Sequence, residues 1–290
     1  MRGFDFVAPT TVSGVLKSTA RKNYKFIAGG TNFLPDLRHQ HERGPELVID
    51  LMRVSGLREI KKGKKKITLG ALTTMTALLE NKFITRETPI LSAMSAKFAG
   101  PIIRNRATIA GNLVGGGPAA DVVPPLLALK ANVTLVSRKG KRTLALDKFL
   151  TGYRQTAIRT GELITGVSFS PPGKNHRWGY YKLARRRAMA ITVVGVAIVL
   201  KVKGKICQEA GISLGAVTPA PIRCYEAEKI LEGNEINLSL VQRAAKACEA
   251  VAKPIDDIRA SAEYRKLMCE VLPRRMISQA LDIPLPLEAG

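Results

Sequence analysis

The chain has 290 residues, of which 46% are hydrophobic, so it can bury one large core or two modest ones. It has no apolar run of membrane-spanning length and no basic-then-apolar leader, so we expect a cytoplasmic protein without a membrane span. Lysine and arginine outnumber aspartate and glutamate by 46 to 23, which gives a formal net charge of +23.

So large an excess of positive charge raises the question of a nucleic-acid partner. The basic runs, at 61–66, 138–142, 185–187 and 201–205, are short and scattered, and aromatic residues make up only 5% of the chain. No zinc-finger, RNP or helix-turn-helix pattern accompanies them, and several fall where hairpin turns are predicted. We therefore favour a solvated surface, or docking onto acidic partner subunits, over specific recognition of nucleic acid.

The residue types that usually carry catalysis or hold metals form no recognisable pattern. The chain has four cysteines, Cys207, Cys224, Cys248 and Cys269. Without C-x-x-C spacing or a nearby histidine, they are better read as structural thiols in a reducing compartment than as ligands of zinc or iron–sulfur clusters. Three histidines, His39, His41 and His176, fall in predicted loops or helix ends. We predict no catalytic residue and no metal ligand in this chain.

Hydrophobic periodicity predicts alternating strands and helices in the first half of the chain. A strand at 4–9 precedes a helix capped by Thr10 or Thr11, and a strand–loop–helix unit spans 24–38. A buried strand at 47–51 completes a small α/β unit. Hairpins are predicted at 57–71 and 132–146, helices at 74–79, 89–99 and 122–129, and a strand at 163–168.

Pro171-Pro172-Gly173 is the best candidate for a domain boundary. Beyond it, three segments alternate in β fashion, at 178–184, 192–201 and 206–214, and three have helical spacing, at 224–231, 239–251 and 261–281. Pro273 is expected to kink or break the last helix. We predict an α+β protein with a two-part domain at 1–176, followed by a domain at 177–290 in which a three-stranded antiparallel sheet carries a helical layer.

Two glycine-rich stretches are the most informative part of the sequence. The first, Phe26–Pro35, follows a strand and opens a helix, an arrangement that points free backbone N–H groups at an anion. The second, Thr108–Asp121, is crowded with residues too small to occlude a ligand, and we read it as a loop that wraps a phosphate-bearing ligand. For the second stretch, a tight glycine-rich turn without a ligand is the alternative. Neither stretch has the G-x-G-x-x-G or G-x-x-x-x-G-K-[ST] pattern.

Taken together, Ala28-Gly29-Gly30-Thr31-Asn32 and Thr108-Ile109-Ala110-Gly111-Asn112, with Pro118-Ala119-Ala120-Asp121, resemble the two FAD loops of a known family. The family that these loops resemble is that of the FAD-binding medium subunits of molybdenum hydroxylases, of the xanthine dehydrogenase and carbon monoxide dehydrogenase type. Its members contain a PCMH-type FAD-binding domain. The resemblance covers essentially the whole chain. It implies an oxidoreductase subunit with FAD as its cofactor, and it assigns the PCMH-type domain to 1–176.

The resemblance also implies a set of cofactor-binding residues. The first loop would contact the FAD pyrophosphate through its backbone, with added side-chain hydrogen bonds from Thr31 and Asn32. Asp121 would bond ribose or ribityl hydroxyls, or simply cap the helix that follows. Lys182 would place a cation near the cofactor, or be one more surface lysine. The complete set is Phe26, Ile27, Ala28, Gly29, Gly30, Thr31, Asn32, Phe33, Phe98, Thr108, Ile109, Ala110, Gly111, Asn112, Asp121, Ile164 and Lys182.

The partners implied are a molybdopterin-binding large subunit and a 2Fe–2S small subunit, with electrons leaving FAD for an acceptor such as NAD or a quinone. One departure concerns the segment after Lys182, where the family usually continues through arginine to an Asp-Ile pair. Here Arg185-Arg186-Arg187 leads to Ala190-Ile191, and the acidic residue is missing. Two alternatives stay open: a stand-alone FAD oxidoreductase, and a basic nucleic-acid-binding protein without a cofactor.

Overall fold

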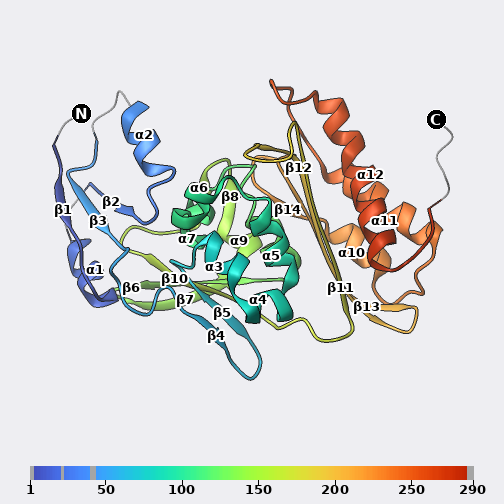
Figure 1. Ribbon diagram of the computed structural model, residues 1–290, viewed down its shortest axis with the longest axis horizontal. Helices are drawn as coiled ribbons and strands as arrows, with labels where there is room; N and C mark the ends of the chain where they lie inside the picture. The colour runs from blue at the N-terminus through green and yellow to red at the C-terminus, as the bar shows by residue number, and fades with distance from the viewer. Residues whose placement is uncertain (1–2, 21–22, 40–43, 286–290) are drawn as a thin grey trace.

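A computed structural model describes residues 3–20, 23–39 and 44–285. Three units follow one another along the molecule (Figure 1), each built around its own sheet. The first sheet has three parallel strands, the second five antiparallel strands, and the third four antiparallel strands beside the C-terminal helices. The predicted α+β class is therefore confirmed, including the small α/β unit at the start.

The first unit has its sheet in the order β1-β3-β2. Its elements are β1 (Asp5–Val7), α1 (Val12–Ser18), β2 (Tyr24–Ile27), α2 (Phe33–His39) and β3 (Leu47–Asp50). Thr11 caps α1 as predicted, because its Oγ1 accepts a hydrogen bond from Gly14 N at 3.1 Å. Val15 and Leu16 of α1 pack in one core with the buried Leu47 and Ile49 of β3.

The middle unit contains the five-stranded sheet, in the order β4-β5-β10-β6-β7, and most of the short helices. Its strands are β4 (Ile60–Lys62), β5 (Ile67–Gly70), β6 (Asn132–Ser137), β7 (Gly140–Ala145), β8 (Leu150–Gly152), β9 (Gln155–Thr156) and β10 (Leu163–Phe169). Its helices are α3 (Met75–Glu80), α4 (Lys82–Glu87), α5 (Pro89–Ala96), α6 (Pro101–Arg106), α7 (Ile109–Gly115), α8 (Val123–Ala128) and α9 (Leu146–Phe149). Both predicted hairpins are confirmed.

Four short helices of the middle unit, α4, α6, α7 and α9, were not predicted. Pro101 lies just beyond the helix predicted at 89–99, and it occupies the first turn of α6. Proline suits that position because the first N–H groups of a helix have no intrahelical partner. The preceding helix, α5, ends at Ala96 and not at Ala99.

The C-terminal unit consists of a sheet and three helices. Its elements are β11 (His176–Ala184), β12 (Thr192–Lys203), β13 (Ile206–Gly215), β14 (Ile222–Arg223), α10 (Tyr225–Leu231), α11 (Leu238–Val251) and α12 (Ala262–Ala280). The three predicted strands are present, and β14 adds a fourth that is too short, at two residues, to leave a periodic signal. Pro273 lies inside α12, which runs unbroken past it.

The central strand β12 does not alternate between buried and exposed residues, which corrects the prediction. It is buried continuously from Thr192 to Leu200, because both faces of its sheet are covered. The helices α10–α12 cover one face (Figure 1), and α5 and α8 of the middle unit cover the other. The second contact is close: a Cβ at Gly211 of β13 would lie 2.0 Å from the carbonyl oxygen of Ala128.

All four basic runs lie at turns, as expected for several of them. They lie at the β4–β5, β6–β7, β11–β12 and β12–β13 turns or in the strand ends beside them, and most of their charged side chains are exposed, whereas Arg142 and Lys201 are half-buried. The four cysteines are buried and unpaired, in keeping with structural thiols. Across the described ranges, no helix combines the length and apolar character needed to cross a membrane.

Glu162 joins the edge strand β7 to the start of β10 through a partly buried ion pair with Arg142. Its carboxylate accepts hydrogen bonds from Arg142 Nε at 2.6 Å, from Arg142 Nη2 at 2.7 Å and from Arg159 N at 2.7 Å. The hydrogen bonds from Arg142 lower the pKa of Glu162. We expect Glu162→Gln to lower the free energy of unfolding by about 2 kcal/mol at neutral pH, because two charge-assisted bonds are lost.

The pH dependence follows from the sign of that shift. A carboxyl with a lowered pKa in the folded protein contributes stability above its unfolded pKa, and this is lost as the pH falls through the folded value. The difference in unfolding free energy between wild type and Glu162→Gln should therefore shrink as the pH falls below 4.5, the ordinary pKa of glutamate. Urea unfolding across this range checks it, with the exposed Glu80→Gln as control. A difference that stays constant down to pH 2–3 would contradict the assignment.

Candidate cofactor-binding site

A cavity of about 1120 Å³ lies where the three units meet. Its wall is formed by the β2–α2 loop, helices α6 and α7, the segment 117–121 and the end of the β11–β12 turn. Pockets for small ligands commonly measure roughly 300–1,000 Å³. The space is therefore large enough for an extended cofactor.

The first glycine-rich stretch forms the loop between β2 and α2. Gly30 has φ of +79°, a left-handed conformation that glycine adopts at little cost. Gly29 lies directly against the end of α6, so that a Cβ there would sit 1.8 Å from the carbonyl oxygen of Arg106. The backbone N–H groups of residues 29–32 donate no hydrogen bond within the described chain. They remain available to an anion, as predicted for this loop.

The second glycine-rich stretch is not a loop throughout, which corrects the prediction, because its first half forms helix α7. Thr108 caps this helix, and its Oγ1 accepts from Gly111 N at 3.1 Å. Ile109 N donates to the carbonyl oxygen of Thr73 at 3.0 Å. These bonds use the donors through which a helix N-terminus would hold an anion. Of the two stretches, the first therefore supplies the free donors.

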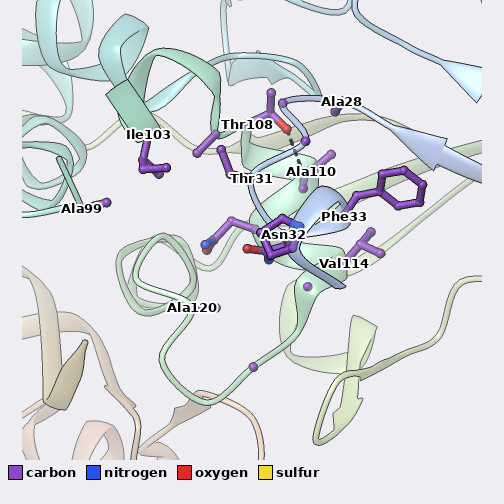
Figure 2. Close-up of a pocket in the computed structure, with 18 of the residues that line it drawn as sticks. Ala28, Thr31, Asn32, Phe33, Ala99, Ile103, Thr108, Ala110, Val114 and Ala120 are labelled. Carbon is purple, nitrogen blue, oxygen red and sulfur yellow. Dashed lines mark hydrogen bonds between the residues drawn. The ribbon is translucent and has the colours of Figure 1, made fainter. Parts of the chain in front are cut away.

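The two stretches contact each other beside the cavity. A Cβ at Gly115 would lie 2.7 Å from Asn32 Nδ2, so the glycine lets the first loop pass close over α7. Figure 2 shows Thr31, Asn32 and Phe33 beside Ala110 and Val114. Both glycine-rich stretches thus form one continuous wall.

At the end of the second stretch, Asp121 forms a buried ion pair with Lys182 that joins the middle unit to strand β11. Lys182 Nζ lies 2.5 Å from Asp121 Oδ2, and the two side chains are 5% and 10% exposed. Thr192 Oγ1 donates to Asp121 Oδ1, and Lys182 Nζ also donates to the carbonyl oxygen of Lys97 at 3.2 Å. Four segments of the chain are held together at this point.

The ion pair excludes two roles that the sequence left open, a surface position for Lys182 and a helix cap for Asp121. Lys182 is not a surface lysine, since its side chain is nearly inaccessible. Asp121 is not the N-cap of the following helix, because Val122 occupies the cap position of α8. Burial raises the pKa of Asp121, and the Lys182 charge opposes this. A carboxyl that is costly to ionise here is thus stabilised by a specific cation.

Most of the predicted site residues line the cavity. They are Phe26, Ala28, Gly29, Gly30, Thr31, Asn32, Phe33, Phe98, Thr108, Ala110, Gly111, Asn112, Asp121, Ile164 and Lys182. Ile27 and Ile109 do not line it. Ile109 is fully buried in the core of the middle unit, and Ile27 lies at the half-buried end of β2.

Several lining residues were not foreseen from the sequence. They are Ile102 and Ile103 on α6, Arg154 in the β8–β9 turn, and Met189 and Ile191 in the β11–β12 turn. Arg154 also forms an ion pair with Asp36 of α2, with Nη2 and Oδ2 2.9 Å apart. Pro101 at a helix start was the one available signal, since it would have placed Ile102 and Ile103 on a short helix.

Groups suited to acid–base or metal chemistry are scarce at the cavity. His39 is exposed at the end of α2, His176 begins β11 far from the lining residues, and His41 lies outside the described residues. Within the described ranges, no group of three or more histidine, cysteine, aspartate or glutamate residues could hold a metal ion. The site offers binding groups: backbone donors, an ion pair and apolar walls.

This combination defines a class of protein that binds an extended, phosphate-bearing cofactor and leaves the chemistry to that cofactor. The glycines leave space for a ligand along the cavity wall, and the backbone N–H groups of residues 29–32 are free to bind an anion. Both features fit a dinucleotide with an anionic centre.

Comparison with known proteins agrees with this class. Residues 2–171 match the FAD-binding domain in molybdopterin dehydrogenase, and residues 179–280 match the carbon monoxide dehydrogenase flavoprotein C-terminal domain. The 6-hydroxypseudooxynicotine dehydrogenase complex subunit alpha of Paenarthrobacter nicotinovorans is 34% identical over 286 residues, or 98% of this chain and 96% of the relative. The carbon monoxide dehydrogenase medium chain of Afipia carboxidovorans is 30% identical over 279 residues, 96% of each chain.

Solved structures give the same result. A chain of carbon monoxide dehydrogenase from Hydrogenophaga pseudoflava superposes with a TM-score of 0.93 at 28% identity, covering 97% of this chain and 98% of that one. The chain therefore belongs to the FAD-binding subunits of the molybdopterin dehydrogenase family. It is an oxidoreductase subunit of the molybdenum hydroxylase type, and its cofactor is FAD.

Proposed function

We propose that this chain is the electron-exit module of its complex. A molybdopterin-binding large subunit would oxidise the substrate, a 2Fe–2S small subunit would relay the electrons, and an acceptor such as NAD or a quinone would collect them at this chain. When bound, FAD supplies the exchange between the one-electron relay and the final acceptor. We also propose a cytoplasmic location, which the four unpaired buried thiols support.

The observation that carries the proposal is that the cavity has groups that would bind a cofactor but few groups suited to acid–base or metal chemistry. The free N–H groups of residues 29–32 would bind the pyrophosphate, and Thr31 and Asn32 would add side-chain bonds. The ion pair of Asp121 and Lys182 would fix its part of the cavity wall, where Asp121 would face the ribityl or ribose hydroxyls. Phe98 and Ile164 supply buried apolar surface. We propose the PCMH-type domain at 1–176 and a second domain at 177–290.

An absorption spectrum of the purified chain, before and after adding FAD and desalting, tests the cofactor site. Flavin bands should remain with the wild type and fall in Asn32→Leu, which removes polar atoms from the first loop. A colourless protein, alone and in its complex, would contradict the site and favour the basic nucleic-acid-binding alternative.

The electron route is tested with the co-expressed three-subunit complex. Carbon monoxide and 6-hydroxypseudooxynicotine, which the names of two relatives suggest, serve as trial substrates. Flavin absorbance should bleach only when the 2Fe–2S subunit is present, and should return on adding NAD or a quinone. If the isolated chain turned over a substrate without partners, it would be a stand-alone oxidoreductase and the proposed route would be wrong.

A further inference from the structure

One carboxylate in the segment before α12, that of Asp257, binds two arginines. Arg259 donates to its Oδ2 from Nε at 3.0 Å and from Nη2 at 2.6 Å, and Arg265 Nη2 donates to its Oδ1. The hydrogen bonds from Arg259 hold the pKa of Asp257 well below its ordinary value. The side chain of Arg265 is 1% exposed and that of Arg259 is 22% exposed. We call these three residues the two-arginine cluster.

Arg259 connects the cluster to the cofactor cavity through a single intervening residue. Its Nη1 donates to the carbonyl oxygen of Thr192 at 2.9 Å. Thr192 Oγ1 in turn donates to Oδ1 of Asp121, which lines the cavity. Since the hydroxyl and the carbonyl belong to one residue at the start of β12, holding the carbonyl also holds the hydroxyl in place.

Arg265 reaches the same part of the cavity wall by a second route. Its Nη1 donates to the carbonyl oxygen of Ala216 in a longer contact of 3.4 Å, and Ala216 N donates to the carbonyl oxygen of Pro118 at 2.7 Å. Ala216 has φ of +66°, which is uncommon for a residue other than glycine. Pro118 lines the cavity, as Asp121 does. Both arginines therefore support the short segment 118–121.

The members of the two-arginine cluster do not line the cavity themselves. What reaches the cavity is the direction of the Asp121 carboxylate, because both of its oxygens are engaged from behind. Lys182 Nζ occupies Oδ2 and the Thr192 hydroxyl occupies Oδ1. A carboxylate offers about four lone-pair sites, so each oxygen can still accept a bond from a cofactor hydroxyl.

We propose that Arg259 is a positioning residue for FAD: by holding the backbone of Thr192, it fixes the direction in which Asp121 faces the cofactor. This rests on the proposed function, in which Asp121 faces the ribityl or ribose hydroxyls. A hydrogen bond weakens steeply when its geometry is poor. Releasing Thr192 therefore weakens FAD binding even while the ion pair between Asp121 and Lys182 remains.

The test compares Arg259→Gln with a matched control, Arg223→Gln. Arg223 belongs to the same unit and donates in the same way to one carboxylate, that of Glu228, from Nε at 3.0 Å and from Nη2 at 2.5 Å. It is not among the residues that line the cavity. We expect the FAD dissociation constant to rise about tenfold in Arg259→Gln and to stay at the wild-type value in Arg223→Gln.

The affinity is measured by fluorescence titration of the FAD-free, full-length protein, in its co-expressed complex where the chain alone releases FAD. Urea unfolding of the FAD-free variants measures what each substitution costs the fold. The visible circular dichroism of the bound flavin should change only in Arg259→Gln, because it reports the surroundings of the cofactor.

A double variant separates positioning from general support of the fold. Thr192→Val removes the hydroxyl that donates to Asp121 and keeps the shape of the side chain. It should weaken FAD binding by a factor similar to that of Arg259→Gln. Because both act on one bond, combining them should weaken binding little further. If the two factors multiply, Arg259 does not act through Thr192 and the proposal is overturned.

The remaining outcomes distinguish this inference from the proposed function. Equal FAD affinity in Arg259→Gln and Arg223→Gln, whether unchanged or weakened in both, overturns the positioning role. If Thr192→Val weakens binding and Arg259→Gln does not, this inference alone fails. If Thr192→Val binds FAD as tightly as the wild type, the role proposed for Asp121 at the cofactor fails as well.

A milder pair of variants decides the matter if Arg259→Gln does not fold. Arg259→Lys keeps a positive charge for Asp257 but lacks the planar fork that binds this carboxylate and the carbonyl of Thr192 together. Arg223→Lys is its control. Weaker FAD binding in Arg259→Lys alone supports the positioning role, and equal binding by the two lysine variants overturns it.

Discussion

Gly29→Ala is expected to lower the free energy of unfolding by roughly 1–3 kcal/mol and to abolish stable FAD binding. The added Cβ would lie 1.8 Å from the carbonyl oxygen of Arg106 and 2.5 Å from its carbonyl carbon, and neither atom can move without shifting the end of α6. The β2–α2 loop would have to withdraw from α6. The free N–H groups of residues 29–32 would then no longer converge on the cavity.

Gly117→Ala is the matched control, because it adds the same methyl group to the other glycine-rich stretch. No atom lies within 4 Å of a Cβ at Gly117. The unfolding free energy should be unchanged or slightly higher, since alanine restricts the unfolded chain. Unfolding is measured in urea on FAD-free protein, because bound cofactor would add its own stabilisation. If Gly29→Ala were as stable as Gly117→Ala, the two loops would not pack as the structure shows.

Features encoded within a few adjacent residues could be predicted from the sequence. Thr11 and Thr74 cap their helices, because each places a hydroxyl just before an apolar periodic segment. The hairpins at 57–71 and 132–146 follow from strand patterns on either side of a basic turn. The cavity was located for the same reason, since each glycine-rich stretch is contiguous in sequence.

Features that depend on distant segments were predicted poorly. The unbroken burial of β12 arises because α8 covers one face and α12 the other, which no local alternation reveals. Ile102 and Met189 line the same cavity although they belong to different units. Helix α6, at six residues, is too short for its periodicity to be recognised, and Pro101 obscured its start.

The ion pair of Asp121 and Lys182 shows the limit most clearly. The two residues are 61 positions apart, and Thr192, the third member, is 71 positions from Asp121. Each residue considered locally had an ordinary interpretation, a helix cap for one and a surface cation for the other. Only the packing of β11 and β12 against the middle unit brings the three together and buries them.

Breaking this pair from either side is expected to cost about 3–5 kcal/mol of unfolding free energy, because it leaves one charge buried without its partner. Asp121→Asn leaves the Lys182 ammonium with the carbonyl oxygen of Lys97, 3.2 Å away. Lys182→Met leaves the carboxylate with the Thr192 hydroxyl alone. The double variant should lose much less than the sum of the two single losses, since no unpaired charge remains.

The two single variants should also differ in pH dependence. Burial already raises the pKa of Asp121, and removing the Lys182 charge raises it further. A carboxyl with a raised pKa in the folded protein contributes stability below its unfolded pKa, and this is lost as the pH rises through the folded value. The unfolding free energy of Lys182→Met should therefore approach that of the wild type as the pH falls from neutral toward about 4. Asp121→Asn has no carboxyl to protonate, so its deficit should not shrink in this way. Urea unfolding of the FAD-free proteins at several pH values measures both effects. Strictly additive losses, or a Lys182→Met deficit that does not change with pH, would show that the two side chains do not act as a buried pair.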